Sequence, residues 1–271
     1  MTKLPEPFYE HAGITIYHAD CRDVLPLMPK VDLVLTDPPY GLQENAHRIR
    51  SRTKLAATTD YGDLDWDAEP ASDREIALTL AAAPLCIIWG GNYFPLPPRR
   101  GWLVWDKQNS GNFADAELAW TNLNISVRIF HFTWNGMIRE GKWRGVPRVH
   151  PTQKPDELFS WCLSFALDAQ IILDPFMGSG TTLVAARDLG RRAIGIEIEE
   201  RYCAIAVERL RQRILPLHEP LSGSKMPIQE NLYGAPANGG NEAENISGQH
   251  WQEDDARPEA SAERDPEKVV S

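Results

Sequence analysis

Two apolar segments, far apart in the chain, each end in an acidic residue that is followed by a tight turn. The first, Val31–Thr36, leads into Asp37-Pro-Pro-Tyr, and the second, Ile171–Leu173, leads into Asp174 and a turn rich in glycine. Short, largely apolar runs are typical of strands buried on both faces of a parallel sheet. Because parallel strands have their carboxyl ends at one edge of the sheet, we expect the two turns to fold against each other.

The rest of the sequence alternates between strand and helix patterns, which predicts an α/β fold with a mostly parallel sheet. The strands expected from apolar runs and turn residues are 14–18, 31–36, 85–89, 101–105, 117–121, 126–133, 170–174 and 192–197. The expected helices are 20–28, 73–83, 155–168, 181–189 and 200–215, and Gly13 predicts a hairpin between residues 8–10 and the first of these strands.

The negative charge is concentrated at the C-terminal end. The chain has 271 residues and a net charge of −10; from Leu217 to Ser271, 4 Lys+Arg against 11 Asp+Glu give −7, which leaves −3 for residues 1–216. We therefore expect one folded domain over 1–216 and an acidic, largely disordered tail over 217–271. A nearly balanced domain can still carry a basic face, because binding follows the local potential rather than the total charge.

Several classes of protein are excluded by pattern. No apolar stretch approaches the roughly 20 residues that a membrane helix needs, and the N-terminal residues lack the apolar run of a signal peptide. The four cysteines are widely spaced and form no CxxC pair, which argues against a zinc site or a disulfide framework: Cys21, Cys86, Cys162 and Cys203. We expect no metal, no membrane partner and a cytoplasmic location, in a prokaryotic or phage-encoded protein.

The second turn has the features of a cofactor site. Gly178 and Gly180 let the backbone approach a ligand closely, and the helix that follows presents free N–H groups suited to a carboxylate. The strand ending at Glu197, 23 residues after Asp174, places an acid where paired ribose hydroxyls bind in dinucleotide folds. The turn is not a phosphate-binding loop, because no lysine follows the glycines, and Leu183 stands where a third glycine would complete GxGxxG. A turn that merely connects strand and helix remains the alternative.

Together these segments resemble the beta-class S-adenosylmethionine-dependent DNA amino-methyltransferases, in which the catalytic half precedes the cofactor half. The resemblance covers about 14–210 and rests on Asp37–Tyr40, Leu173–Thr182, Ala193–Tyr202 and His150-Pro-Thr-Gln-Lys154-Pro. It implies a doubly wound, Rossmann-like methyltransferase fold with a mostly parallel seven-stranded sheet, circularly permuted relative to the usual order. The cofactor implied is S-adenosyl-L-methionine.

The resemblance also implies roles for particular residues. Asp20 and Cys21 are expected near the adenine, Glu197 on the ribose, and His150 and Lys154 at the methionine end of the cofactor. The residues expected to line the rest of the cofactor pocket are Asp37, Asp174, Phe176, Gly178, Ser179, Gly180, Thr181 and Thr182. Trp89 and Trp105 lie in segments that resemble those beside the base pocket, although core packing suits them equally well.

Asp37, Pro38, Pro39 and Tyr40 are the expected catalytic residues. The exocyclic amine of adenine or cytosine is a poor nucleophile, because its lone pair is delocalised into the ring. Asp37 and the Pro38 carbonyl can accept hydrogen bonds from its two N–H groups, with the proline ring fixing the direction of the carbonyl. Tyr40 can stack on a base that has been flipped out of the duplex.

Two basic segments are expected to contact double-stranded DNA. The first lies within about 42–70 and contains Arg48, Arg50, Arg52 and Lys54; the second lies within 134–149 and contains Arg139, Lys142, Arg144 and Arg148. Cations bind phosphates, and arginine also reads bases by paired hydrogen bonds. Since the segment available for target recognition is short, we expect a short target or help from a second subunit, as in a homodimer.

The resemblance favours methylation of adenine at N6, because Asp at the first catalytic position occurs mainly in adenine-N6 members and Ser mainly in cytosine-N4 members. Cytosine-N4 methylation is the alternative, and a catalytically idle DNA-binding protein that keeps the cofactor is a further one. A cognate restriction endonuclease stays open as a partner.

Overall fold

The computed structural model describes residues 3–41, 69–108, 114–135, 138–139, 141–143 and 153–212. The chain divides into two units, Met1–Glu219 and Pro220–Ser271. The second unit lies outside the described residues, so the expected boundary at 216 and the expected acidic tail stay predictions. Within the described ranges, no helix combines the length and apolar character that crossing a membrane requires.

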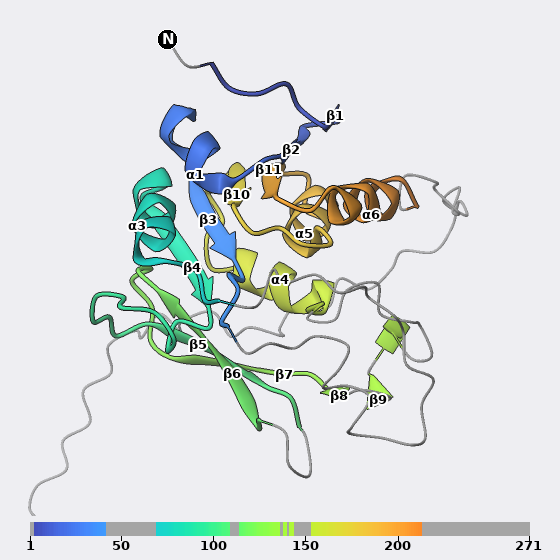
Figure 1. Cartoon of the computed structure of the whole chain (residues 1–271). Helices are drawn as coiled ribbons and strands as arrows, with labels where there is room; N and C mark the ends of the chain where they lie inside the picture. Colours follow the sequence, from blue (N-terminus) through green and yellow to red (C-terminus); the bar gives the residue numbers. More distant parts are fainter. Residues whose placement is uncertain are drawn as a thin grey trace, which may run out of the picture. The chain divides into compact units, whose positions relative to one another are not determined.

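The described part of the first unit is built on a nine-stranded sheet in the order β1-β2-β11-β10-β3-β4-β6-β5-β7 (Figure 1). Seven of these strands run parallel to one another, and β1 and β6 run antiparallel to their neighbours. The strand bounds are β1 Tyr9–His11, β2 Ile14–His18, β3 Leu33–Thr36, β4 Leu85–Trp89, β5 Trp102–Asp106, β6 Ala116–Thr121, β7 Arg128–His131, β10 Ile171–Asp174 and β11 Arg192–Glu197. A separate pair, β8 Trp134–Asn135 with β9 Ile138–Arg139, is antiparallel.

The fold class expected from the sequence is confirmed, but the strand count is two higher than the seven expected. One strand beyond the seven is β1, which forms the expected hairpin with β2 at Gly13, where φ is +80°. The glycine is needed there because a side chain strains this left-handed conformation. The other difference is that both β5 and β7 follow the antiparallel strand β6 at the far edge.

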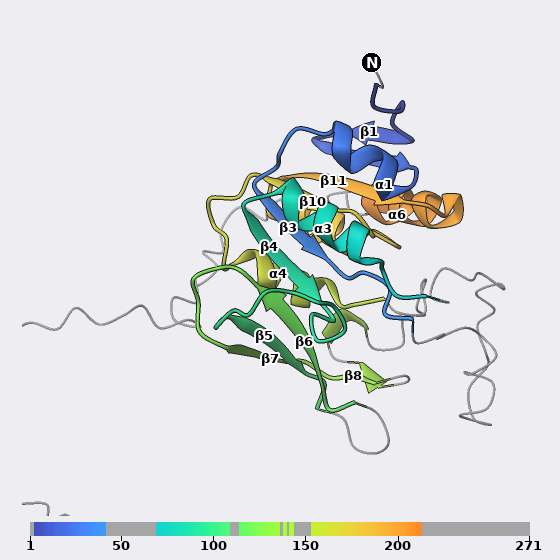
Figure 2. The same cartoon turned by 60° about the vertical axis from the view of Figure 1, so that its left-hand side comes forward.

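Helices cover both faces of the sheet, as Figure 2 shows. On one face lie α1 Cys21–Val24, the single 3₁₀ turn η1 Leu25–Leu27 and α3 Asp73–Ala82; on the other lie α4 Asp156–Leu163, α5 Thr181–Asp188 and α6 Glu200–Gln212. The short 3₁₀ turn η2 Gly141–Trp143 precedes α4 along the chain. Each face therefore has its own hydrophobic core, which explains why β3 and β4 are largely apolar on both faces.

Helix starts follow the local signals in the sequence. The Asp20 side chain accepts a hydrogen bond from the Arg22 N–H and caps α1. Ser72 and Glu75 form a reciprocal capping box at α3. Helix α4 is shorter than the expected 155–168 and ends at Leu163. The chain tightens there into i→i+3 hydrogen bonds, from the Phe165 N–H to the Cys162 carbonyl and from the Ala166 N–H to the Leu163 carbonyl, each 3.2 Å.

Strands β3 and β10 are neighbours whose connections leave in opposite directions. From β3 the chain passes through α3 to β4 on one side, and from β10 it passes through α5 to β11 on the other. Leu33 pairs with Ile172 and Val34 with Leu173, so the two strands end at the same edge. A point where the winding reverses is the usual ligand crevice of an open α/β sheet. The expectation that the two distant turns meet is confirmed.

Candidate active site

A pocket of about 360 Å³ opens at this point of reversal. It extends from the start of α1 past the turn after β10 to Asp37 at the end of β3. The size falls in the range of small-molecule sites. Of the residues expected at the cofactor or catalytic site, the pocket is lined by Asp20, Cys21, Asp37, Pro39, Lys154, Asp174, Phe176, Gly178, Ser179, Thr181, Thr182 and Glu197.

Asp174 joins three elements at the floor of the pocket. Its carboxylate accepts hydrogen bonds from the Thr36 hydroxyl at 2.6 Å, from the Phe176 N–H at 3.1 Å and from the Thr182 hydroxyl at 2.5 Å. The side chain is 3% exposed, and burial raises its pKa to about 6. Asp174 therefore ties β3, β10 and α5 together, which fixes the turn that faces the ligand space.

Gly180 serves the packing of helices rather than the pocket wall. Its φ is +78°, and a Cβ at this position would lie 2.8 Å from the Ala206 Cβ of α6. Gly178, by contrast, lines the pocket, and its N–H donates to the Glu197 carboxylate at 2.9 Å. Because Gly180 has no side chain, α6 can pack closely against the start of α5.

Glu197 is a buried acid at the end of β11. Its two oxygens accept hydrogen bonds from the backbone N–H groups of Gly178, at 2.9 Å, and Glu199, at 2.8 Å. Burial raises its pKa to about 7. An ionised carboxylate has about four acceptor sites, so two remain for further donors. A pair of ribose hydroxyls would supply such donors, so the residue fits an adenosine-containing cofactor.

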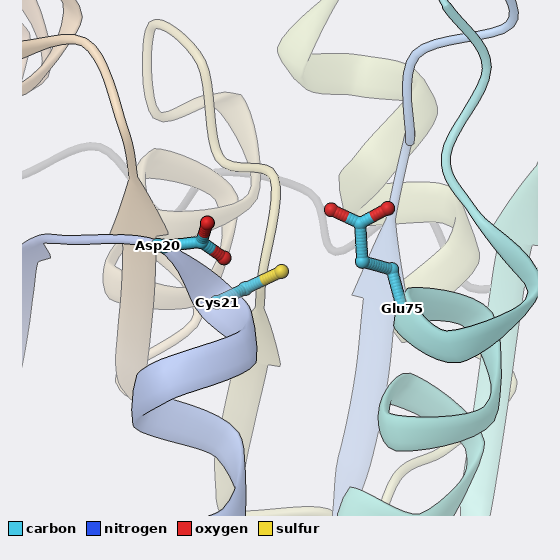
Figure 3. A group of neighbouring side chains, drawn as sticks. All are labelled: Asp20, Cys21 and Glu75. Atoms are coloured by element: carbon cyan, nitrogen blue, oxygen red, sulfur yellow. The ribbon is translucent and has the colours of Figure 1, made fainter.

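Asp20 and Cys21 face Glu75 across the other end of the pocket (Figure 3). One ligand-type atom from each of the three lies within 4.8 Å of the others. Asp20 is already paired with the Arg22 guanidinium, and Glu75 with the Ser72 cap. Burial raises the pKa of the Cys21 thiol to about 12, so it is uncharged at neutral pH. These features suit the wall of a pocket better than a metal site.

At the catalytic end, Asp37 lies in a network of charged groups. One of its oxygens accepts from the Tyr40 hydroxyl and the other from the Lys154 ammonium. Lys154 Nζ also lies 3.3 Å from a carboxylate oxygen of Glu117 on β6, and Lys107 pairs with the other oxygen of Glu117. Two acids and two lysines thus form a formally neutral cluster. Lys154, expected at the methionine end of the cofactor, lines the pocket, and its ammonium is held by Asp37 and Glu117.

Burial and charge act in opposite directions on this cluster. Burial raises the pKa of Asp37, against the lowering effect of the Lys154 ammonium. Burial also acts to raise the pKa of Glu117, but Lys154 and Lys107 outweigh it and the pKa is lowered. Burial would lower the pKa of Lys154, yet Asp37 and Glu117 raise it well above its usual value. Lys154 is therefore an ammonium at neutral pH and favours the ionised form of Asp37.

The Asp37-Pro-Pro-Tyr turn is held by its backbone as well. The Ala71 N–H donates to the Pro39 carbonyl at 3.0 Å, and Tyr40 forms an isolated antiparallel bridge with Pro70. Within the described ranges, the Pro38 carbonyl accepts no hydrogen bond. This carbonyl is the second acceptor that the sequence predicts for a substrate amine.

The tryptophans that the sequence associated with the base pocket pack in the core, which was the alternative expected for them. Trp89 and Trp105 are 0% and 1% exposed and belong to the core, and the Trp105 indole donates to the Phe132 carbonyl at 3.0 Å. Neither lines the pocket. The Tyr40 ring instead stacks on Tyr93, with centroids 4.9 Å apart and an angle of 15° between the planes.

A second charged network connects the cofactor turn with α4. Arg209 of α6 donates to the Ser179 hydroxyl at 3.1 Å and to the Thr181 hydroxyl at 3.3 Å, and it pairs with Asp156 at 2.8 Å. Asp156 in turn lies 3.4 Å from the ammonium of Lys142. The side chains of Arg209 and Asp156 are 11% and 4% exposed. This buried pair therefore braces the start of α5, next to the pocket.

Most of the basic residues expected to contact DNA lie outside the described ranges, as does His150: these are Arg48, Arg50, Arg52, Lys54, Arg144 and Arg148. Arg139 is described only by its backbone, in β9. Lys142 is exposed, and its ammonium pairs with Glu157 at 3.1 Å and lies 5.0 Å from the centroid of the Trp143 ring. The DNA-contacting roles of these residues stay predictions.

Comparisons with known proteins agree with this geometry. A family model described as DNA methylase, the N6/N4 type, matches residues 104–208. The chain is 27% identical over 270 residues to the type II methyltransferase M.ScaI of Streptomyces caespitosus, covering 76% of this chain and 84% of the relative. It is 28% identical over 254 residues to the type II methyltransferase M2.LlaDCHI of Lactococcus lactis subsp. cremoris, covering 76% and 93%.

These matches support a member of the adenine-N6/cytosine-N4 DNA methyltransferase family. Its cofactor is S-adenosyl-L-methionine, as expected from the sequence. Among solved structures, the M1.HpyAVI–SAM complex is 24% identical with a TM-score of 0.42, covering 72% of this chain and 99% of that one. Both curated relatives are named type II methyltransferases.

Sequence reasoning missed three residues at the catalytic end. Glu117 was expected only as part of a strand, Thr36 as the last residue of another, and Tyr93 was not singled out. One signal for Glu117 was available in the sequence: it is an acid inside a strand whose other residues are mostly apolar. Such a residue needs a cationic partner, and the sequence alone does not say which lysine supplies it.

Proposed function

We propose that this DNA methyltransferase transfers a methyl group from S-adenosyl-L-methionine to the exocyclic N6 of adenine in double-stranded DNA, at a specific site and on a flipped base. The observation that carries the proposal is the meeting of the two turns. Asp37 and Glu197 line one pocket although 160 positions separate them in sequence. Asp at the first catalytic position supports adenine rather than cytosine as the target.

The residues that would hold the cofactor line the pocket from Asp20 to Lys154. Glu197 has two unused acceptor sites for the ribose hydroxyls, and Asp20 and Cys21 lie at the end expected for the adenine. S-adenosyl-L-methionine supplies an electrophilic methyl group when it is bound. Asp174, through its three hydrogen bonds, keeps the turn that lines the cofactor space in place.

The catalytic turn prepares the amine. Each oxygen of Asp37 accepts one hydrogen bond in the structure, so each can accept another from the incoming N–H group. The Pro38 carbonyl accepts from the second N–H. These two acceptors favour a pyramidal nitrogen with an available lone pair, and the Asp37 carboxylate stabilises the positive charge that develops on it. Lys154 orients Asp37 and favours its ionised form, while Glu117 holds Lys154.

The basic segments within 42–70 and 134–149 would bind the DNA backbone and supply target recognition. We place the enzyme in the cytoplasm of a prokaryote or among phage-encoded proteins. A homodimer and a cognate restriction endonuclease are the partners that the short recognition segment and the relatives favour. Size measurement of the purified protein, free and with DNA, tests the dimer directly.

The test of the proposed reaction uses unmethylated DNA and methyl-labelled S-adenosyl-L-methionine. After incubation with the purified full chain, the DNA is digested to nucleosides and the label is identified by chromatography with mass detection. Label in N6-methyladenine is expected. Label in N4-methylcytosine would replace the adenine assignment, and label in neither nucleoside would contradict the proposed activity and support an idle DNA-binding protein.

A further inference from the structure

The ring of Tyr93 covers the catalytic tyrosine in this structure. Its plane is stacked on that of Tyr40, with centroids 4.9 Å apart and 15° between the planes. Two rings in direct contact leave no room between them for a third. A flipped base that stacks on this face of Tyr40 must therefore displace Tyr93.

The surroundings of Tyr40 show where a base can approach. Within the described ranges, the groups around its ring include the Lys154 ammonium, 5.7 Å from the centroid, the buried turn at Gly90, the Phe94 ring at 6.2 Å and Tyr93. Lys154, Gly90 and Phe94 are buried, whereas Tyr93 is 50% exposed. A ligand arriving from solvent therefore reaches the Tyr40 ring at the position that Tyr93 occupies.

The two tyrosines differ in how firmly they are held. The Tyr40 hydroxyl donates to Asp37, its backbone bridges Pro70, and its ring lies so close to Gly90 that a Cβ there would be 2.0 Å from a ring carbon. Tyr93 is fixed by its backbone, since its N–H donates to the Gly90 carbonyl at 2.8 Å. Its side chain, however, has no hydrogen-bond partner within the described part of the chain, so the ring can swing while the turn stays in place.

We propose that Tyr93 is a substrate-binding residue that shields the Tyr40 ring in the free enzyme and moves outward to form the second wall of a tyrosine–base–tyrosine stack. This inference rests on the proposed function, because it needs a base flipped toward Asp37. The exposed ring keeps the catalytic turn covered until the base arrives, and the same ring then holds the base from its solvent side. Base stacking on an aromatic ring tolerates any base, so Tyr93 adds affinity and leaves sequence recognition to other segments.

The test compares wild type, Tyr93→Ala and Tyr93→Phe on a short duplex that contains the target adenine, once the target has been mapped. Loss of one stacking ring should weaken binding by about 5- to 150-fold in Tyr93→Ala. Tyr93→Phe should stay within about twofold of wild type, because the ring rather than the hydroxyl makes the stack. Replacing the target by 2-aminopurine reports stacking through fluorescence, which should rise more in Tyr93→Ala than in wild type.

A second duplex with an abasic target separates stacking from a general loss of binding. Wild type and Tyr93→Ala should bind this duplex equally, since there is no base for Tyr93 to contact. Leu167→Ala, which removes an exposed apolar side chain elsewhere (72% exposed), serves as the matched control and should bind both duplexes like wild type. Thermal unfolding and cofactor binding verify that each variant is folded.

The outcomes are distinct. If wild type transfers no methyl group, the proposed function fails and Tyr93 is not at issue. If wild type is active and Tyr93→Ala binds the adenine duplex as well as wild type, or more tightly, the stack is wrong and Tyr93 at most blocks the site. An equal loss of affinity on the adenine and abasic duplexes would also overturn the inference, because the contact would not involve the base.

Discussion

We predict that Glu197 makes the binding of the cofactor depend on pH near neutrality. Burial raises the pKa of this carboxyl to about 7 in the free protein, from an ordinary value of 4.5. Ribose hydroxyls donate to the ionised form, so a bound cofactor should bring the pKa back down. Binding must then release a proton wherever the free carboxyl is protonated and the bound one is not. The affinity for S-adenosyl-L-methionine should therefore rise with pH through about 7.

The magnitude follows from the two pKa values. With about 7 in the free protein and about 4.5 in the complex, the protonated fraction of the free carboxyl falls from about three quarters at pH 6.5 to a few per cent at pH 8.5. The dissociation constant should thus be about fourfold higher at pH 6.5 than at pH 8.5, and about half a proton should be released per site at pH 7. Asp174, with a pKa of about 6, titrates mainly below this range.

Calorimetry in two buffers of different ionisation enthalpy measures the released proton directly. The matched variant is Glu197→Gln, which keeps the size of the side chain and removes its titration. Subtracting its proton release from that of wild type cancels the titration of the cofactor's own amino group. Equal proton release by the two proteins at pH 7 would refute the argument that a buried, protonated Glu197 must ionise to bind the ribose.

Three further predictions concern the residues around the pocket. Lys154→Met should raise the pKa of Asp37 and move the acid limb of the kcat/KM profile upward by about one pH unit or more, whereas Lys154→Arg should leave it nearly in place; an unmoved limb in the Met variant would show that Lys154 does not act on Asp37. Gly90→Ala should abolish most methyl transfer, because the added Cβ would overlap the Tyr40 ring. Gly190→Ala is the control: its φ of +70° is similar but nothing lies within 4 Å of the added Cβ, so it should lose only about 1–2 kcal/mol of stability and remain active. Equal activity of the two variants would contradict the overlap. Arg209→Met leaves Asp156 buried with one partner fewer and should cost roughly 3–5 kcal/mol in urea unfolding and raise the KM for the cofactor, and an unchanged unfolding midpoint would count against a bracing role.

The fold was largely predictable, because its signals are local. The apolar run before Asp37 and the glycine turn after Asp174 predicted strands ending at one edge, and Ser72 and Asp20 predicted helix starts that are confirmed. The predicted end of α4 at residue 168 was wrong. Residues 164–169 keep an apolar pattern, but their backbone tightens into 3₁₀-type turns. Both edge strands were expected, β1 from the hairpin at Gly13 and β7 from the run 126–133, whereas the total of seven strands that the resemblance implied was too low.

The site was predictable where the function requires a residue in a turn, and not where it requires a partner across the sheet. Asp37, Asp174 and Glu197 each end a strand, and a strand end can be located from sequence. Glu117 reaches Lys154 because β6 runs beside β4, and β4 lies next to β3, the strand that leads to Asp37. This neighbourhood is a property of the topology of the sheet. Tyr93 reaches Tyr40 through a turn whose side-chain direction the sequence does not specify.

The central claim is that Asp37 prepares an amine in the same pocket in which Glu197 holds the cofactor. The most direct measurement compares wild type with Asp37→Ala for methyl transfer to unmethylated DNA and, separately, for binding of S-adenosyl-L-methionine. We predict that Asp37→Ala loses transfer by at least about a hundredfold, the scale of a lost transition-state hydrogen bond, while it still binds the cofactor within a few-fold of wild type. Transfer at the wild-type rate by Asp37→Ala would contradict the account.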